Sequence, residues 1–136
     1  MKGHVFQIAT LLVLASCSPA ADTKSAEQGV TAFHRTMDAE EYGPIYDSSD
    51  AEMKKATSRD RFMKLLNVFH AKLGPFKSGK TVGWNDNATT SGHYVTLNRE
   101  AAFARGPATE QFIFRVDGNR ALLVGYQVNS DLLITG

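Results

Sequence analysis

Apolar residues recur at helical intervals in the first half of the chain. A first stripe begins near Ser25 and advances in steps of three and four residues through Ala26, Val30, Phe33 and Met37. A second stripe follows Ser58, a residue type that often caps helices, and it consists of Phe62, Leu65, Leu66, Phe69 and Leu73. Gly74-Pro75 then supplies a stop signal. The pattern predicts two amphipathic helices, each with one face toward a core.

Two shorter helical segments are predicted between these helices. Residues 39–46 have helical character, which Gly43-Pro44 interrupts. Ser49, with Glu52 three residues later, has the spacing of a capping box and predicts a short helix through residues 53–56. Residues 25–74 are therefore expected to be helical with short breaks.

After Pro75 the apolar residues alternate, which is typical of strands with one buried face. The first two predicted strands are residues 76–84 and 94–104, separated by a polar loop at 85–92, and Gly106-Pro107 is expected to make the next turn. The inner face of a third strand is predicted to carry Phe112, Phe114 and Val116. Asp117-Gly118-Asn119 predicts a hairpin into a fourth strand, whose inner face would carry Leu122, Val124, Tyr126 and Val128. Helices followed by an antiparallel meander predict an α+β domain, with N-terminal helices packed on a four-stranded sheet.

Composition narrows the classes of function. Lys and Arg total 15 against 14 for Asp and Glu, and this near-neutral balance argues against a nucleic-acid partner. Apolar residues make up 43% and charged residues 21%, which is typical of a globular domain. Cys17 is the single cysteine, so an intrachain disulfide and a cysteine-based zinc site are both excluded.

The N-terminus has the pattern of a secretory signal peptide. Lys2 precedes an apolar stretch at residues 5–15, and small residues follow. The stretch is shorter than the roughly 20 apolar residues that a membrane span needs. We therefore expect three regions, a signal peptide at 1–16, a lipidated cysteine and tether at 17–24, and one globular domain at 25–136.

Leu14-Ala15-Ser16-Cys17 resembles the bacterial lipobox, in which an aliphatic residue and two small residues precede a cysteine. The resemblance implies that Cys17 is lipidated on its sulfur and becomes the N-terminus after cleavage. Ser18 follows the cysteine, and the resemblance then favours the outer membrane, because an aspartate at this position favours retention at the inner membrane. The expected location is the bacterial cell envelope, with the domain in the periplasm.

The order of elements in the globular part resembles the cystatin-like and nuclear-transport-factor-like folds, and in particular small uncharacterised bacterial lipoprotein families. The resemblance covers about residues 25–130 and rests on Phe33, Asp38 to Tyr42, Tyr46-Asp47-Ser48-Ser49, Met53-Lys54, Phe62, Leu73-Gly74, His93-Tyr94-Val95, Glu110 and Gly125-Tyr126. It implies a curved antiparallel sheet that wraps a helix in a cone.

Two charged residues are expected on the inner face of the sheet. Glu110 shares the parity of Phe112 and Phe114, and we interpret it as half of a peripheral ion pair with Arg105 near the sheet edge, in preference to a general base. Arg99 shares the face of Leu97. It either holds an anionic ligand in the cavity or extends its guanidinium to solvent past apolar neighbours.

Aromatic residues and histidines complete the set of candidates. Trp84 and Tyr126 are candidate pocket residues together with Arg99 and Glu110, although aromatic residues on strands are more often core. The histidines of the mature chain, His34, His70 and His93, are expected at or near the surface. No HxH or HxxxH pair occurs, so we expect no metal, no cofactor and no catalytic residue.

Three functions remain open at this point. The first is a non-enzymatic envelope lipoprotein whose domain binds a small apolar ligand or a partner protein. The second is a small cavity enzyme of the ketosteroid-isomerase-like type, with Glu110 or a tyrosine as acid or base. The third is an assembly accessory that acts through its sheet face and forms a homodimer.

Overall fold

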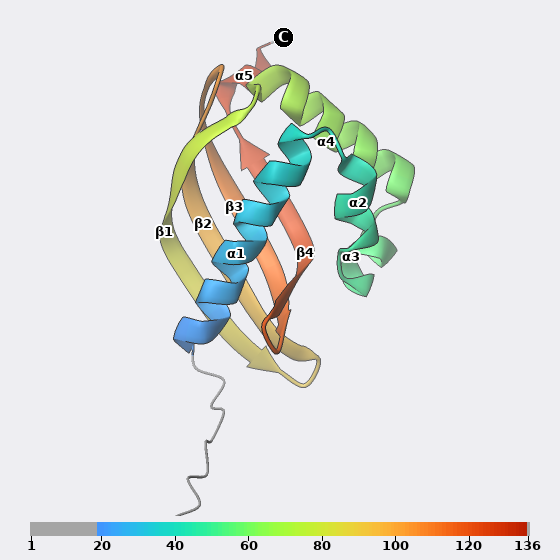
Figure 1. Ribbon diagram of the computed structural model, residues 1–136, viewed down its shortest axis with the longest axis vertical. Coiled ribbons are helices and arrows are strands. Elements are labelled where there is room, and N and C mark those ends of the chain that lie inside the picture. Colours follow the sequence, from blue (N-terminus) through green and yellow to red (C-terminus); the bar gives the residue numbers. More distant parts are fainter. Residues whose placement is uncertain (1–18, 136) are drawn as a thin grey trace, which may run out of the picture.

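A computed structural model describes residues 19–135 of the chain (Figure 1). Cys17 and the predicted signal peptide at residues 1–16 lie outside the described residues. The elements in order are α1 (Pro19–Asp38), α2 (Tyr42–Asp47), α3 (Ala51–Ala56), α4 (Arg59–Leu73), β1 (Phe76–Thr89), β2 (Gly92–Phe103), β3 (Gly106–Asp117), β4 (Arg120–Asn129) and α5 (Asp131–Ile134). The strands form one antiparallel sheet in the order β1-β2-β3-β4, which confirms the predicted α+β class.

The sheet curves around α1, which lies across its concave face and contacts all four strands (Figure 1). The predicted stripe of α1 is buried against the sheet and consists of Ala26, Val30, Phe33 and Met37. The main core joins α1, α2 and α4 to strands β2 to β4, and a smaller core lies near α5 around Leu73, Phe103 and Val128. Among the helices of residues 19–135, none combines the length and the apolar character that crossing a membrane requires.

Helix α1 begins earlier than the pattern indicates. Residues 18–24 were expected to be a tether, but the helix starts at Pro19 and the side chain of Asp22 is buried. Proline fits the first turn of a helix because the N–H that it lacks has no partner there. An acidic residue in the first turn, here Asp22, is favoured by the helix dipole. The globular domain therefore starts within two residues of Cys17.

The first hairpin is longer than predicted. Residues 85–92 were expected to be a loop, but β1 and β2 stay paired from Phe76 opposite Phe103 to Thr89 opposite Gly92. The polar character of this stretch reflects its place on an edge strand, where one side of the backbone and most side chains meet solvent. The next turn lies at Ala104-Arg105, so Gly106 already belongs to β3.

A bulge changes the inner face of β4. Ile113 pairs with Gly125 and Phe114 pairs with Leu123, so Val124 has no partner on β3. The extra residue shifts the alternation by one. Leu123 is therefore buried in place of the predicted Leu122, whereas Tyr126 and Val128 contact the core as predicted.

The N-terminal cap of α4 is the residue that the sequence predicts, whereas the cap of α3 is not. Ser58 caps α4 as predicted, and its hydroxyl accepts a hydrogen bond from the N–H of Arg61. The cap of α3 is Asp50, not Ser49, and its carboxylate accepts hydrogen bonds from the N–H of Glu52 at 3.0 Å and from Nε of Arg115 at 2.7 Å. Burial opposes ionisation of Asp50, but these hydrogen bonds outweigh it and hold its pKa below the usual 3.8.

Replacing Asp50 with asparagine is expected to make the free energy of unfolding fall less steeply as the pH is lowered. Because the folded pKa of Asp50 lies below its unfolded value, the stabilisation is present above about pH 4 and is lost as the pH falls through the folded pKa. We expect the variant to be about 1–2 kcal/mol less stable at pH 7, since Arg115 loses a charged partner. Urea unfolding at pH 7 and pH 3 measures the difference. Asp47→Asn, which removes an exposed pair with Arg59, is the control. It should change the difference in stability between pH 7 and pH 3 less than Asp50→Asn does. An equal change in the two variants would contradict the stabilising role of ionised Asp50.

Candidate functional site

Buried and partly buried polar side chains gather where α1 crosses the inner face of the sheet. We call this region the α1–β1 seam and define it by three groups. The first group is His34, Glu110 and Tyr126, the second is Glu27, Thr81 and Arg99, and the third is Asp22, Asp86 and His93. One residue of α1 belongs to each group, so the helix holds all three in line.

Glu110 is the centre of the first group. Nε2 of His34 lies 3.0 and 2.9 Å from the two carboxylate oxygens, and the hydroxyl of Tyr126 donates to Oε2 at 2.6 Å. Glu110 is 3% exposed and His34 is 4% exposed. Burial, and then the charge of Glu110 and its hydrogen bond, raise the pKa of Tyr126 well above its usual value. Tyr126 therefore stays protonated and acts as a donor.

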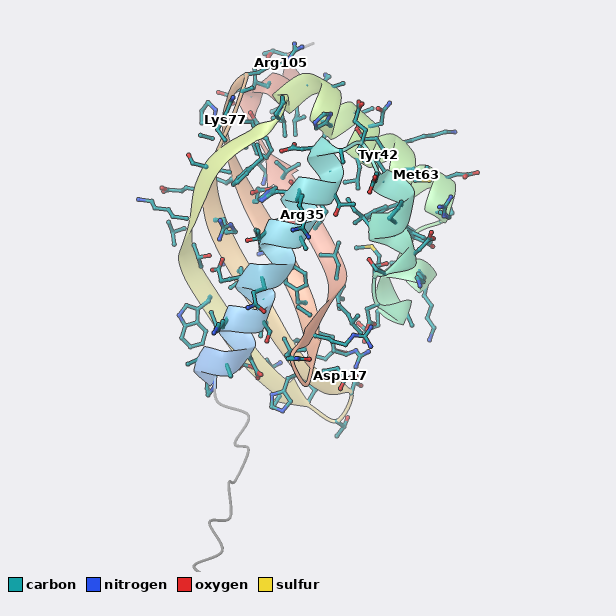
Figure 2. All side chains as sticks on the ribbon, in the orientation of Figure 1. Arg35, Tyr42, Met63, Lys77, Arg105 and Asp117 are labelled. Atoms are coloured by element: carbon teal, nitrogen blue, oxygen red, sulfur yellow. The ribbon has the colours of Figure 1, made fainter. Side chains whose placement is uncertain are left out.

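This arrangement corrects two sequence interpretations. Glu110 is not in a peripheral pair with Arg105, because it lies within β3 opposite Arg99 on β2 and Val128 on β4. Arg105 is in the turn at the end of the sheet, and Figure 2 shows it at the end opposite Asp117. His34 is buried, not superficial, because the curved sheet covers more of α1 than one stripe. Its spacing of four residues from Val30 was a signal that could have revealed this.

Arg99 forms the second group. It is 8% exposed, and its Nη1 donates to Oε2 of Glu27 at 2.7 Å and to Oγ1 of Thr81 at 2.8 Å. Thr81 also donates to Glu27. The guanidinium thus stays inside the seam and does not extend to solvent. Its Nε is buried and has no hydrogen-bond partner among the described residues.

A groove of about 480 Å³ opens along the seam above these side chains. Its lining combines apolar and charged residues, namely Val30, Thr31, His34, Arg35, Asp38, Phe76, Ser78, Gly79 and Arg99. Gly79 leaves room at one wall of the groove, because its missing side chain would crowd two neighbours. A Cβ there would lie 3.2 Å from the ring of Phe76 and 3.3 Å from Nη2 of Arg99. The groove therefore gives a small molecule access to the Arg99 guanidinium and to His34.

The four predicted pocket residues do not all meet. Arg99 lines the groove, and Glu110 and Tyr126 lie beneath it, hydrogen-bonded to each other and, through Glu110, to His34. Trp84 is 56% exposed on β1 opposite Leu97 and does not line the groove, so the structure does not bring it together with the other three. Sequence reasoning also missed Thr81, which lies opposite Arg99 in the pairing of β1 with β2, and Glu27, whose side chain reaches Arg99 because α1 lies against the sheet.

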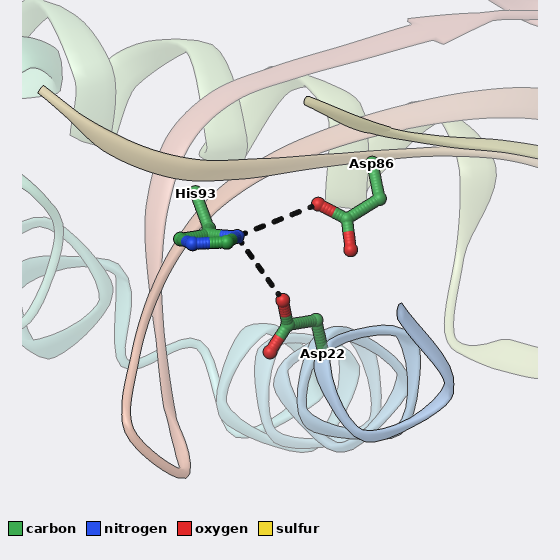
Figure 3. A group of neighbouring side chains, drawn as sticks. All are labelled: Asp22, Asp86 and His93. Carbon is green, nitrogen blue, oxygen red and sulfur yellow. Dashed lines mark ion pairs between the residues drawn. The ribbon is translucent and has the colours of Figure 1, made fainter. Parts of the chain in front are cut away.

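The third group brings together residues from three elements (Figure 3). Nδ1 of His93 on β2 lies 3.5 Å from Oδ2 of Asp22 on α1 and 3.9 Å from Oδ1 of Asp86 on β1. Burial, and then the neighbouring charge of Asp22, raise the pKa of Asp86. His93 lies near the surface as expected, with its side chain 43% exposed, but the two acidic neighbours were not predicted.

A larger hollow of about 800 Å³ lies at the end of the sheet beside α5. Its charged lining residues are all exposed and consist of Lys80, Glu100, Arg105 and Asp131. Because none of these charges is withdrawn from water, the hollow offers a ligand weaker electrostatic contacts than the groove at Arg99. The α1–β1 seam is therefore the stronger candidate site.

Comparison with known proteins identifies the family of the chain but assigns no activity to it. No curated protein sequence matches the chain. A family profile described as "Protein of unknown function (DUF4019)" matches residues 30–126. The match covers most of the chain, from the middle of α1 to Tyr126 on β4, and so includes His34, Arg99 and Glu110. The chain therefore belongs to the DUF4019 family.

Proposed function

We propose that this chain is a bacterial envelope lipoprotein whose domain binds a small ligand with a carboxylate group in the groove of the α1–β1 seam. Cys17 would carry the lipid, and α1, which starts at Pro19, would hold the domain close to the membrane surface. The domain would face the periplasm, with the outer membrane favoured by Ser18. The curved sheet around α1 supports the resemblance to cystatin-like and nuclear-transport-factor-like folds (Figure 1).

The observation that carries the ligand proposal is the unused edge of the Arg99 guanidinium. Nη1 is occupied by Glu27 and Thr81, whereas Nε is buried and has no hydrogen-bond partner within residues 19–135. Nη2 makes no hydrogen bond to a described residue and lies beside Gly79 at the groove wall. Nη2 would meet a ligand carboxylate at the groove wall, and a small rotation of the side chain would bring Nε beside it, so that the two nitrogens bind the carboxylate through two parallel hydrogen bonds. Val30 and Phe76 would contact an apolar body attached to that carboxylate.

A carboxylate probe tests this proposal. We expect benzoate to bind the full chain, purified in a non-ionic detergent, at one site by isothermal titration calorimetry. Benzamide, which has the same shape without the charge, should bind at least about tenfold more weakly, since a charged hydrogen-bonded pair contributes about 1.5–3 kcal/mol. Arg99→Gln should weaken benzoate binding to a similar extent, and Arg105→Gln, in the exposed turn, should not. Equal binding of benzoate and benzamide would contradict the proposal.

A second candidate function is catalysis by His34. A buried carboxylate orients its imidazole, which also lines the groove, and this is the arrangement that general bases use. A ketosteroid-isomerase-like site is less well supported, because the Tyr126 hydroxyl already donates to Glu110 and is not free for an oxyanion. Conversion of a bound carboxylate by wild type, but not by His34→Gln, would favour the enzyme.

The assembly function receives less support. The exposed large apolar residues among the described residues are spread over three elements, with Leu65 and Val68 on α4, Val82 and Trp84 on β1, and Ile134 on α5. An interface between copies normally needs a contiguous apolar patch. The predicted homodimer therefore stays a prediction for which this surface offers no argument.

A further inference from the structure

The third polar group of the seam has the composition of a metal site. Asp22, Asp86 and His93 come from α1, β1 and β2, and their ligand atoms all lie within 4.8 Å of one another. Figure 3 shows the two carboxylates and the imidazole turned toward a common point. His93 and Asp86 are held there by the sheet, because Asp86 pairs with Val95 and His93 pairs with Ala88, which makes them diagonal neighbours on the inner face.

Asp22 is buried without the contacts that a buried carboxylate normally has. It is 5% exposed, yet it accepts no hydrogen bond from a backbone N–H, lysine or arginine of residues 19–135. Its Oδ2 lies 3.5 Å from Nδ1 of His93, and its other close neighbour is the carboxyl group of Asp86. Asp86 also lacks a lysine or arginine partner in that part of the chain. Two carboxylates that are largely shielded from water thus face each other, and His93 supplies at most one positive charge. A divalent cation would stabilise such a group.

The distances suit a small cation with short bonds. Zinc bonds to imidazole nitrogen and carboxylate oxygen at about 2.0–2.2 Å, which in a tetrahedron separates neighbouring ligand atoms by about 3.3 Å. The separations from Nδ1 of His93, 3.5 and 3.9 Å, need only a small closure to reach that value. The imidazole favours a transition metal over Ca²⁺ or Mg²⁺, which prefer all-oxygen sites.

We propose that Asp22, Asp86 and His93 bind one divalent transition-metal ion, with Zn²⁺ as the preferred occupant and the fourth position open to water. No metal was expected from the sequence, because it contains no HxH or HxxxH pair. Here the ligands lie 64 and 7 residues apart in the chain and meet only through the packing of α1 on the first hairpin. The ion would tie the first turn of α1 to the paired strands β1 and β2.

Zinc titration of the full chain tests the site. The protein is purified in a non-ionic detergent without a polyhistidine tag, stripped with EDTA and titrated with zinc chloride by isothermal titration calorimetry. We expect one saturable ion per chain and a rise in the midpoint of thermal unfolding. His93→Gln and Asp86→Asn should each weaken binding by about tenfold or more and abolish the rise.

His70→Gln is the matched control. His70 also lies near two carboxylates, Asp38 at 3.4 Å and Glu40 at 3.8 Å, but it meets them with opposite ring nitrogens, so they do not converge on one point. This variant should bind zinc like wild type. In EDTA, Asp86→Asn should unfold at or above the wild-type midpoint, which shows that a loss of binding is not a loss of folding. Absence of saturable binding to wild type, or equal binding by His93→Gln, would overturn the proposal.

Discussion

Replacing Glu110 with alanine is expected to lower the free energy of unfolding by about 2–5 kcal/mol, since each buried donor left without an acceptor costs about 1–3 kcal/mol. The substitution leaves Nε2–H of His34 and the hydroxyl of Tyr126 without their acceptor. Both donors would then be buried without a hydrogen-bond partner, although each gave up hydrogen bonds to water on folding. Urea denaturation at pH 7, followed by circular dichroism, measures the change.

Two further variants calibrate this result. Glu110→Gln keeps one acceptor oxygen and loses the charge, so its effect should fall between alanine and wild type. Glu100→Ala removes a glutamate that pairs with Lys80 at 3.7 Å on the exposed side of the same sheet. Its expected effect is about 0–1 kcal/mol, as for other surface pairs. If Glu110→Ala and Glu100→Ala were equally mild, Glu110 would not be the centre of a buried network.

Cys17→Ala is expected to release the protein from the membrane fraction almost completely. Two or more acyl chains on Cys17 would hold the protein stably, since each buried CH₂ contributes about 0.8 kcal/mol. Electrostatic attraction to anionic lipids is not expected to replace the lipid anchor. Cleavage before Cys17 would remove Lys2 from the 15 basic residues and none of the 14 acidic ones, so the mature chain would have no net charge. Fractionation of cells that express wild type and variant, followed by immunoblotting, makes the comparison.

The matched control for the anchor is Ser18→Ala, which alters the neighbouring residue and leaves the lipidation site intact. This variant should stay with the membranes through a carbonate wash that removes peripheral proteins. Mass spectrometry of the N-terminal peptide should find acyl chains on Cys17 in wild type and in Ser18→Ala. Retention of Cys17→Ala in the washed membranes would refute the lipid anchor.

The sequence was sufficient where a property depends on neighbours along the chain. The buried faces of α1, β2 and β3 follow directly from apolar spacing, and Glu110 and Arg99 were placed on the correct face of the sheet by parity. Parity failed at Val124, because a bulge adds a residue that leaves no pattern of its own. The start of α1 was missed because small polar residues after a cysteine also suit a tether.

The candidate site was only partly predictable, because its side chains meet across long chain separations. His34 and Glu110 are 76 residues apart, and their contact depends on where α1 crosses the sheet. Arg99 lies opposite Glu110 on the neighbouring strand, yet it bonds to Glu27 of α1. Nothing in the local pattern around either residue distinguishes these partners from others on the same face.

The sequence by itself determined the α+β class, the inward faces of the main elements, and the position of one cysteine shortly after an apolar stretch. These follow from local periodicity and composition, which act within a few residues. The tertiary structure alone decided that His34 is buried against Glu110, that Arg99 lines a groove with an Nε that no described residue binds, and that Asp22 meets Asp86 and His93. The physical reason is that the curvature of the sheet and the path of α1 set these contacts together, and both arise from packing the whole core at once.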